Sequence, residues 1–229
     1  MRLPWLSDDD PLPPVDGALR RPNGLLAAGG GLSVPRLIEA YSRGCFPWFS
    51  EGEPVLWWSP DPRMVLFPQE LHVPRSLARR MRHADFQVRA DTAFGDVLDG
   101  CAAPRDHETG TWITAEMRQA YVRLHEAGLA HSVETWIDGR LAGGLYGVAI
   151  GRAFFGESMF TRVADASKIA LVTMVHTLEQ HGVGLIDCQM RTEHLVRFGA
   201  REIARKDFVE RVRELVAAAP APEVWSGYM

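Results

Sequence analysis

An aspartate–glycine turn between two strand-forming segments places the strongest limit on how this chain can fold. Asp138-Gly139 separates Val133–Ile137 from Leu141–Ile150, and both segments are mostly apolar. An Asp-Gly pair favours the two-residue turn of a β-hairpin, because both turn residues need a left-handed backbone. Ala153–Phe155 follows closely and predicts the start of a third strand. The middle of the chain is therefore expected to form an antiparallel sheet.

A long helix and one more strand are expected after this sheet. Asp165 begins an apolar pattern with helical spacing, and Gly182 ends it. The short segment Leu185–Gln189 predicts a buried strand, and two further helices are expected at about 192–198 and 206–218. The order β-β-β-α-β-α indicates an α+β fold, in which helices pack on a mostly antiparallel sheet.

The first 70 residues differ in composition from the rest and are rich in Pro, Gly and Trp. Within them, Ser33 is a good N-cap for a helix that runs to Gly44. We therefore expect a small N-terminal α+β domain over residues 1–70 and a second domain over residues 71–229. Apolar spacing and capping residues predict three helices early in the second domain, at about 74–83, 92–101 and 114–128.

Composition limits the classes of protein to which the chain can belong. Of its 229 residues, 46% are hydrophobic, which supports a full core and argues against disorder. The three cysteines are widely spaced, and the chain has neither a CxxC motif nor a His pair at metal spacing, so we expect neither a metal nor a disulfide framework. The N-terminus lacks an apolar signal segment, and no 18-residue apolar run follows, which predicts a cytoplasmic protein with no membrane partner.

Polar residues at the end of the last predicted strand form a candidate site. Asp187 and Gln189 are two residues apart, so we expect their side chains on one face, with Cys188 pointing into the core. A carboxylate beside an amide can hold an amino group, because the amide both donates and accepts. Glu157, in a segment bounded by aromatic residues, adds a second carboxylate. The alternative is that Asp187 caps a loop and Glu157 is a solvated strand residue.

Five motifs carry a resemblance to a known family. They are Gly44-Cys45-Phe46-Pro47-Trp48-Phe49, Trp57-Trp58-Ser59-Pro60-Asp61-Pro62-Arg63, Gly110-Thr111-Trp112-Ile113-Thr114, Gly156-Glu157-Ser158-Met159-Phe160 and Leu185-Ile186-Asp187-Cys188-Gln189. From about Asn23 to Phe208, the chain resembles the bacterial leucyl/phenylalanyl-tRNA–protein transferases. The resemblance implies transfer of Leu or Phe, and less well Met, from aminoacyl-tRNA to proteins that begin with Arg or Lys. The product is then an N-degron, a signal for degradation.

The resemblance also implies a GNAT-like fold for the C-terminal domain, as in acetyltransferases, but no cofactor. The chain lacks the Gly-rich loop that holds the pyrophosphate of coenzyme A in such folds. Two alternatives are an acyltransferase that uses acyl-CoA and a noncatalytic binder of tRNA ends or N-degrons. The missing loop argues against the first, and Asp187, Gln189 and Glu157 argue against the second. We expect a monomer whose partners are aminoacyl-tRNA and protein substrates.

The resemblance assigns residues to the aminoacyl-tRNA donor. The apolar pocket for the Leu or Phe side chain is assigned to Trp112, Leu145, Phe154 and Ile186, for which the alternative is ordinary core. Candidates for stacking on the terminal adenosine are Tyr41, Trp48 and the Trp57-Trp58 pair, with Trp48 as the leading candidate by resemblance. Tyr121 is assigned with Tyr41 and Trp48 to the binding of adenosine or tRNA. At least one residue of the neighbouring Trp57-Trp58 pair is expected in the core between the domains.

Arginines concentrate in the predicted helix at 74–83, which contains Arg75, Arg79, Arg80 and Arg82. Because the acceptor stem of tRNA presents phosphates, this helix is a candidate for electrostatic contact with the stem. The alternative is a solvated helix face. The sequence has no base-reading motif, so recognition of the backbone and the tRNA end is expected.

Glu157 and Asp187 are assigned to the acceptor, which brings a positive side chain and an α-amine. The reaction is aminolysis of an activated ester, and an α-amine with a pKa of about 7.7–8.0 is partly free base at neutral pH. Orientation of the amine and the carbonyl is therefore expected to supply most of the acceleration. Two roles are open for Asp187. It takes the amine proton, directly or through Gln189, or it only positions the amine while the ribose hydroxyls carry the proton.

Overall fold

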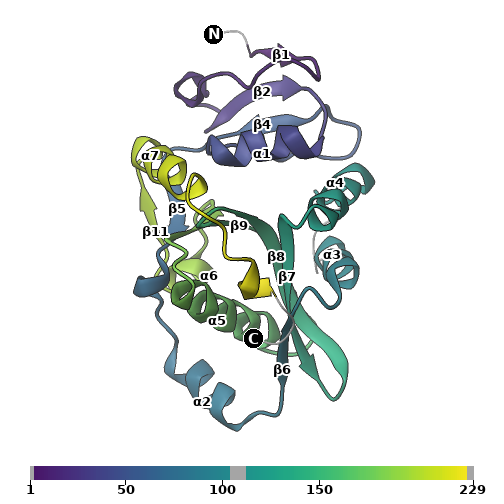
Figure 1. The fold of residues 1–229 in the computed structure, drawn as a ribbon, viewed down its shortest axis with the longest axis vertical. Helices are drawn as coiled ribbons and strands as arrows, with labels where there is room; N and C mark the ends of the chain where they lie inside the picture. Colours follow the sequence, from purple (N-terminus) through teal and green to yellow (C-terminus); the bar gives the residue numbers. More distant parts are fainter. Residues whose placement is uncertain (1–2, 104–111, 226–229) are drawn as a thin grey trace.

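The computed structural model describes residues 3–103 and 112–225 and contains two β-sheets (Figure 1). The smaller sheet, at the top of Figure 1, has the strand order β1-β2-β4-β3. Its strands are β1 (Trp5–Leu6), β2 (Leu25–Gly29), β3 (Phe46–Pro47) and β4 (Leu56–Trp58). Helix α1 (Val34–Ser42) begins as predicted, since the Ser33 side chain accepts a hydrogen bond from the Arg36 amide.

The larger sheet has seven strands in the order β11-β5-β10-β9-β8-β7-β6. They are β5 (Arg63–Leu66), β6 (Gln87–Ala90), β7 (Ala130–Ile137), β8 (Arg140–Ile150), β9 (Ala153–Thr161), β10 (Leu185–Gln189) and β11 (Arg201–Ile203). The predicted hairpin joins β7 to β8, and both turn residues have left-handed backbones, at φ 49° for Asp138 and 68° for Gly139. Only β9 and β10 pair in parallel among the described strands of this sheet. The predicted α+β class is confirmed.

Helices cover both faces of the larger sheet. They are α2 (Arg75–His83), α3 (Phe94–Ala102), α4 (Ala115–Glu126), α5 (Ala166–Gln180), α6 (Glu193–Val196) and α7 (Arg205–Val216), with short 3₁₀ turns at Val15–Gly17, Pro68–Glu70 and Pro222–Trp225. None of the helices in the described part of the chain is long and apolar enough to cross a bilayer.

Two hydrophobic clusters lie on opposite faces of the larger sheet because side chains alternate along each strand. Phe155 and Leu185 point into the first cluster, which includes residues of α1, α3, α4 and α7 and joins the two sheets. Their neighbours Phe154 and Ile186 point into the second cluster, which is built around α5. We call these the α4-side and the α5-side clusters.

The strands extend and connect beyond what the sequence predicts. Strand β9 begins at Ala153, as predicted, and continues to Thr161. Strand β5 begins at Arg63 and pairs with β10 and β11, so these residues belong to the larger sheet although they fall inside the predicted N-terminal segment 1–70. The change from one sheet to the other occurs between Trp58 and Arg63.

Candidate active site

A β-bulge in β9 displaces Glu157 from the regular ladder. Tyr146 of β8 pairs with Ser158. The next residue, Gly147, pairs with Gly156, so Glu157 is the extra residue of the bulge. Bulges occur near active sites because they redirect a side chain without ending the strand. Glu157 is thereby turned toward the aromatic residues of the α4-side cluster.

A second irregularity lies at the end of β10. Asp187 pairs with Val65 and Gln189 pairs with the neighbouring Met64, which leaves Cys188 as the extra residue. Cys188 packs against the α5-side cluster, as the alternation predicted, and burial raises the pKa of its thiol. Gln189 has a left-handed backbone at φ 59°, a conformation that is uncommon for residues other than glycine.

Glu157 is the centre of a hydrogen-bond network. Its Oε1 accepts from the Tyr41 hydroxyl at 2.8 Å and from Gln189 Nε2 at 2.9 Å. Its Oε2 accepts from the Tyr121 hydroxyl at 2.6 Å, and the two tyrosine oxygens lie 2.7 Å apart. The carboxylate is thus fixed by three donors, of which none carries a positive charge.

The surroundings of Glu157 move its pKa into the physiological range. Loss of hydration raises the pKa of the carboxyl, and hydrogen bonds from Tyr121 and Tyr41 lower it. Loss of hydration is the larger effect, and the resulting pKa is about 7. Glu157 as a whole keeps partial solvent exposure. A carboxyl group with this pKa can exchange a proton near neutral pH.

Asp187 has a different set of partners. Arg63 Nε donates to Oδ1 at 2.8 Å and Arg63 Nη2 donates to Oδ2 at 2.7 Å, and both side chains are fully buried. The guanidinium carbon lies 4.7 Å from the Phe46 ring centre and 4.6 Å from that of Phe208. Oδ1 also accepts a hydrogen bond from the backbone N–H of Gln189 at 2.9 Å. Asp187 therefore fixes the backbone of the residue that contacts Glu157.

Arg63 corrects the assignment of Asp187 to the incoming amine. Both carboxylate oxygens are bound and Asp187 has no solvent exposure, so it presents no free acceptor here. The sequence motif that ends in Arg63 does not by itself indicate a role for this arginine. Arg63 and Asp187 are 124 residues apart, so their ion pair leaves no local pattern in the sequence. The one sequence feature that points to it is a positive residue at the end of an apolar, Trp-rich motif.

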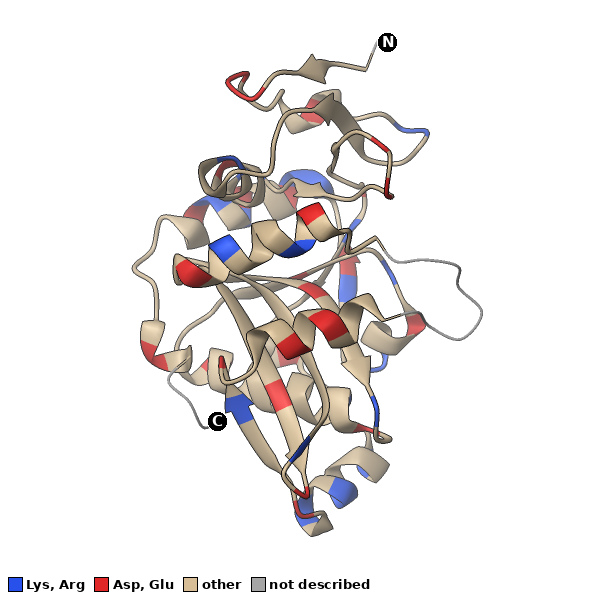
Figure 2. Cartoon of the chain, turned by 90° about the vertical axis from the view of Figure 1, so that its right-hand side faces the viewer, with Lys and Arg blue, Asp and Glu red and all other residues tan. Residues whose placement is uncertain are grey.

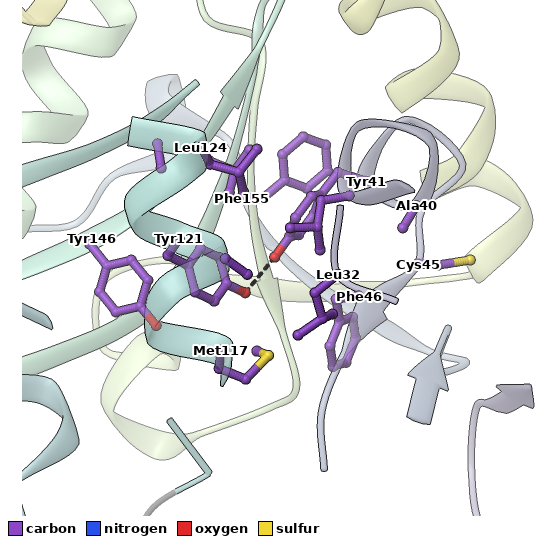
Figure 3. Packing of buried hydrophobic residues seen from close by; sticks show 14 of the residues in the cluster. Leu32, Ala40, Tyr41, Cys45, Phe46, Met117, Tyr121, Leu124, Tyr146 and Phe155 are labelled. Carbon is purple, nitrogen blue, oxygen red and sulfur yellow. Dashed lines mark hydrogen bonds between the residues drawn. The ribbon is translucent and has the colours of Figure 1, made fainter. Parts of the chain in front are cut away.

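Tyr41 and Tyr121 lie in the core, which corrects their assignment to the adenosine. Both are fully buried, and the Tyr41 ring packs on Phe155 with centroids 5.1 Å apart, so neither ring offers an open face to a base. Figure 3 shows their hydroxyl groups pointing at each other between α1 and α4. Burial raises the pKa of both phenols, and the negative charge of Glu157 is the second-largest cause. Both phenols therefore remain protonated and can donate hydrogen bonds.

Trp48 retains an open surface. It is 39% exposed and makes an edge contact with Trp58 at a centroid distance of 5.6 Å. Trp58 Nε1 donates to the Trp48 carbonyl at 2.7 Å, which fixes the backbone there. Trp57 is fully buried and donates to the Gly29 carbonyl, as expected for one member of the pair.

The four residues assigned to the aminoacyl pocket do not share one environment. Leu145, Phe154 and Ile186 are buried in the α5-side cluster, on the three adjacent strands β8, β9 and β10. Trp112 is half-buried and packs against the α4-side cluster, on the other face of the sheet. The assignment of Trp112 to that pocket is therefore corrected, because the sheet separates it from the other three residues.

The arginines of α2 differ in exposure. Arg75 and Arg79 are exposed, whereas Arg80 is half-buried and lies 3.5 Å from an Asp165 oxygen at the start of α5. Figure 2 shows Lys and Arg in blue at the lower end of the molecule, where Figure 1 places α2. Two of the three predicted phosphate contacts are thus exposed and have no ion pair within the described part of the chain.

Comparison with known proteins decides the family. Residues 65–213 match the family model described as leucyl/phenylalanyl-tRNA protein transferase, and residues 30–61 match the model of its N-terminal domain. The chain belongs to the leucyl/phenylalanyl-tRNA–protein transferase family. It is therefore an aminoacyltransferase, as the five sequence motifs implied.

Relatives named leucyl/phenylalanyl-tRNA–protein transferase match almost the whole chain. The protein from Stutzerimonas stutzeri is 62% identical over 91% of this chain and 92% of its own length. The one from Nitrosomonas europaea is 60% identical over 96% and 93%. The one from Azoarcus sp. is 58% identical over 98% and 96%.

Solved structures resemble this transferase more distantly. A GCN5-related N-acetyltransferase from Kribbella flavida has a TM-score of 0.36 and 13% identity, covering 73% of this chain and 60% of that chain. The C-terminal domain of a putative lysylphosphatidylglycerol synthetase from Agrobacterium fabrum has a TM-score of 0.40 and 14% identity, over 80% and 56%. Likenesses this weak carry no argument about the reaction. Within residues 3–103 and 112–225, no group of three or more His, Cys, Asp or Glu side chains is placed to hold a metal ion.

Proposed function

We propose that this transferase moves Leu or Phe, and less well Met, from aminoacyl-tRNA to the α-amine of proteins that begin with Arg or Lys. The observation that carries the proposal is Glu157, a partly exposed residue whose carboxylate is held by three neutral donors, one of which is Gln189. A negative group in this setting suits an acceptor with two positive charges. The product is an N-degron that leads to degradation of the acceptor protein.

In this proposal Glu157 and Gln189 contact the acceptor, and Asp187 positions Gln189 without contacting the acceptor itself. Arg63 already neutralises Asp187, so the charge available to a cationic peptide is that of Glu157. Gln189 Nε2 donates to Glu157, which leaves the amide oxygen as an acceptor for the incoming amine. Asp187 is then a positioning residue, because its Oδ1 holds the Gln189 backbone.

The reaction forms the bond between the acceptor nitrogen and the aminoacyl carbonyl carbon, and it breaks the ester bond to the ribose oxygen. The amine loses one proton and the ribose oxygen gains one, so the overall step consumes no other reagent. Glu157, with a pKa of about 7, is matched to an α-amine with a pKa of about 7.7–8.0 and can hold the proton between the two. Orientation of amine and ester supplies the larger part of the acceleration.

The donor is assigned to three separate regions. Leu145, Phe154 and Ile186 are proposed to line the aminoacyl pocket on the α5 side. The exposed face of Trp48 is proposed to stack on the terminal adenosine, and base stacking of this kind contributes about 1–3 kcal/mol. Arg75 and Arg79 are proposed to contact phosphates of the acceptor stem.

The test is transfer to a synthetic peptide. The protein is incubated with Phe-tRNA or Leu-tRNA and a peptide that begins with Arg, and the product is identified by its mass. Matched peptides begin with Glu or with Nα-acetylated Arg, and both are expected to remain unmodified. Equal transfer to the Glu peptide would contradict recognition by a carboxylate, and absence of product with either donor would contradict the proposed reaction.

A further inference from the structure

The end of the chain returns to the larger sheet and packs beside the proposed aminoacyl pocket. After α7, the chain crosses in front of the sheet to a short turn at Pro222–Trp225, drawn in yellow in Figure 1. Ala221 and Val224 are buried there, and Trp225 is half-buried. All three belong to the α5-side cluster. The C-terminal turn is therefore part of the wall on this face of the sheet.

Trp225 contacts two aromatic rings of the sheet. Its indole stacks on the His131 imidazole with centroids 4.2 Å apart and planes 5° apart. It also lies 5.7 Å from the Phe154 ring centre at an angle of 28°. The His131 ring cannot follow a moving partner freely, because its Nδ1 is hydrogen-bonded to an Asp91 oxygen at 2.7 Å. The indole therefore has a fixed support.

Phe154 is confined on another side by the backbone of β8. A Cβ atom added at Gly147 would come within 2.5 Å of the end of the Phe154 ring, so only glycine leaves room for the ring there. With the Gly147 backbone on one side and Trp225 on another, the ring has little freedom to shift. Phe154 shares its cluster with Leu145 and Ile186, the other residues proposed to line the pocket.

We propose that Trp225 is a specificity-determining residue for the aminoacyl donor. This inference rests on the proposed function, in which Phe154 lines the aminoacyl pocket. By holding Phe154 in place, Trp225 sets the size of the pocket without being required for the transfer step. Removal of the indole lets the Phe154 ring retreat, which enlarges the pocket. A larger pocket accepts bulkier side chains and holds Leu less well, and one methylene in such a pocket changes selectivity by about 10–200-fold.

The experiment measures donor choice with minimal donors. Leucyl-, phenylalanyl- and tryptophanyl-adenosine are each supplied with an Arg-initiated peptide, and kcat/KM is determined for every donor. Trp225→Leu is expected to raise the Trp-to-Leu ratio of kcat/KM by about tenfold. Trp225→Phe, which retains a ring, is expected to keep most of the original ratio. Trp5→Leu removes an exposed indole of the smaller sheet and is expected to change nothing.

Two truncations distinguish the indole from the chain end. A chain that ends at Trp225 is expected to keep the original donor ratio, and a chain that ends at Pro220 is expected to behave like Trp225→Leu. Thermal melting is recorded for each variant, because a purely structural role would lower the melting temperature and reduce transfer from all donors by one common factor. That result, or an unchanged ratio, would overturn the inference.

A Phe154 variant separates this inference from the proposed function. Phe154→Leu is expected to change the donor ratio by itself. If Phe154→Leu changes the ratio and Trp225→Leu does not, the pocket is correct and the role of Trp225 is wrong. If neither variant changes the ratio, the assignment of Phe154 to the pocket fails as well.

Discussion

Glu157 and Asp187 are two carboxylates on neighbouring strands, but their surroundings give them different properties. Glu157 receives hydrogen bonds from two tyrosines and an amide, keeps some exposure and has a pKa of about 7. Asp187 is fully buried and bound through both oxygens to a guanidinium group. The first can change its charge and meet a ligand, whereas the second holds a permanent ion pair. The comparison shows that hydrogen-bond and ion-pair partners, not residue type, decide which carboxylate can exchange a proton and which one has a structural role.

The largest effect is expected from breaking the buried ion pair. Arg63→Met leaves Asp187 buried without a counter-charge, which is expected to cost about 3–5 kcal/mol in the free energy of unfolding. The double variant Arg63→Met, Asp187→Leu removes both charges and is expected to recover most of that loss. Urea unfolding measures both. Arg201→Met breaks an exposed pair with Glu70 and serves as the control, with little expected change. A loss at Arg63 as small as that at Arg201 would show that Asp187 needs no counter-charge.

The next effect concerns the acceptor. Glu157→Gln retains the size of the side chain but removes its charge, so kcat/KM for an Arg-initiated peptide is expected to fall about 10–100-fold, the equivalent of a charge-assisted hydrogen bond. The half-saturation point of the aminoacyl donor is expected to stay the same. Steady-state kinetics with each substrate varied separately measures both. Glu70→Gln changes an exposed carboxylate that pairs with Arg201 outside this network, and it is the control. A change in the half-saturation point of the donor alone would show that Glu157 contacts the aminoacyl group and not the peptide.

The raised pKa of Glu157 predicts a pH dependence with a definite sign. Below pH 7 the carboxyl is mostly neutral and attracts a cationic peptide weakly, and above pH 7 it is charged, so kcat/KM for the peptide should rise through an inflection near pH 7. Glu157→Gln should lose this inflection and retain the one near pH 8 that belongs to the α-amine. Rates are corrected for spontaneous hydrolysis of the donor. A wild-type profile with the amine inflection alone would exclude Glu157 as the titrating group.

The smallest effect tests the tyrosine donors. The Tyr121 hydroxyl donates to Glu157 at 2.6 Å, and this hydrogen bond lowers the pKa of Glu157. Tyr121→Phe removes the hydrogen bond, so the pKa of Glu157 and the inflection should move up by about one pH unit. Tyr146→Phe is a matched control, because the Tyr146 hydroxyl is also buried but has no hydrogen-bond partner in the described part of the chain. The same shift in both variants would mean that packing, not the hydrogen bond, sets the pKa.

Local patterns in the sequence predicted the local features of this fold. The Asp138-Gly139 hairpin, the Ser33 cap and the strand at Leu185–Gln189 are confirmed, because each depends on residues close together in the chain. The inward direction of Cys188 followed from strand alternation in the same way. The Glu157 bulge was missed because an extra residue in a ladder leaves no mark on the strand that contains it.

Contacts between distant segments were not predictable from these patterns. Tyr41 and Tyr121 were identified as site residues, but only the packing of α1 against α4 shows that they serve Glu157 rather than a base. Trp112 carried the same apolar signal as Leu145, and the sequence does not tell which face of the sheet each one covers. The roles of single residues in the site stay predictions until the variants above are measured.

Arg63 stands at the start of β5, directly after the smaller sheet, and Asp187 follows it by 124 residues. More than half of the chain must therefore be synthesised and folded between the two partners before the pair can close, and contacts of such long range form late because closing a long loop costs entropy. Until then, neither the Gln189 backbone nor the arrangement around Glu157 is fixed. A growing chain that has not reached Asp187 therefore holds Arg63 without its counter-charge and Glu157 without Gln189.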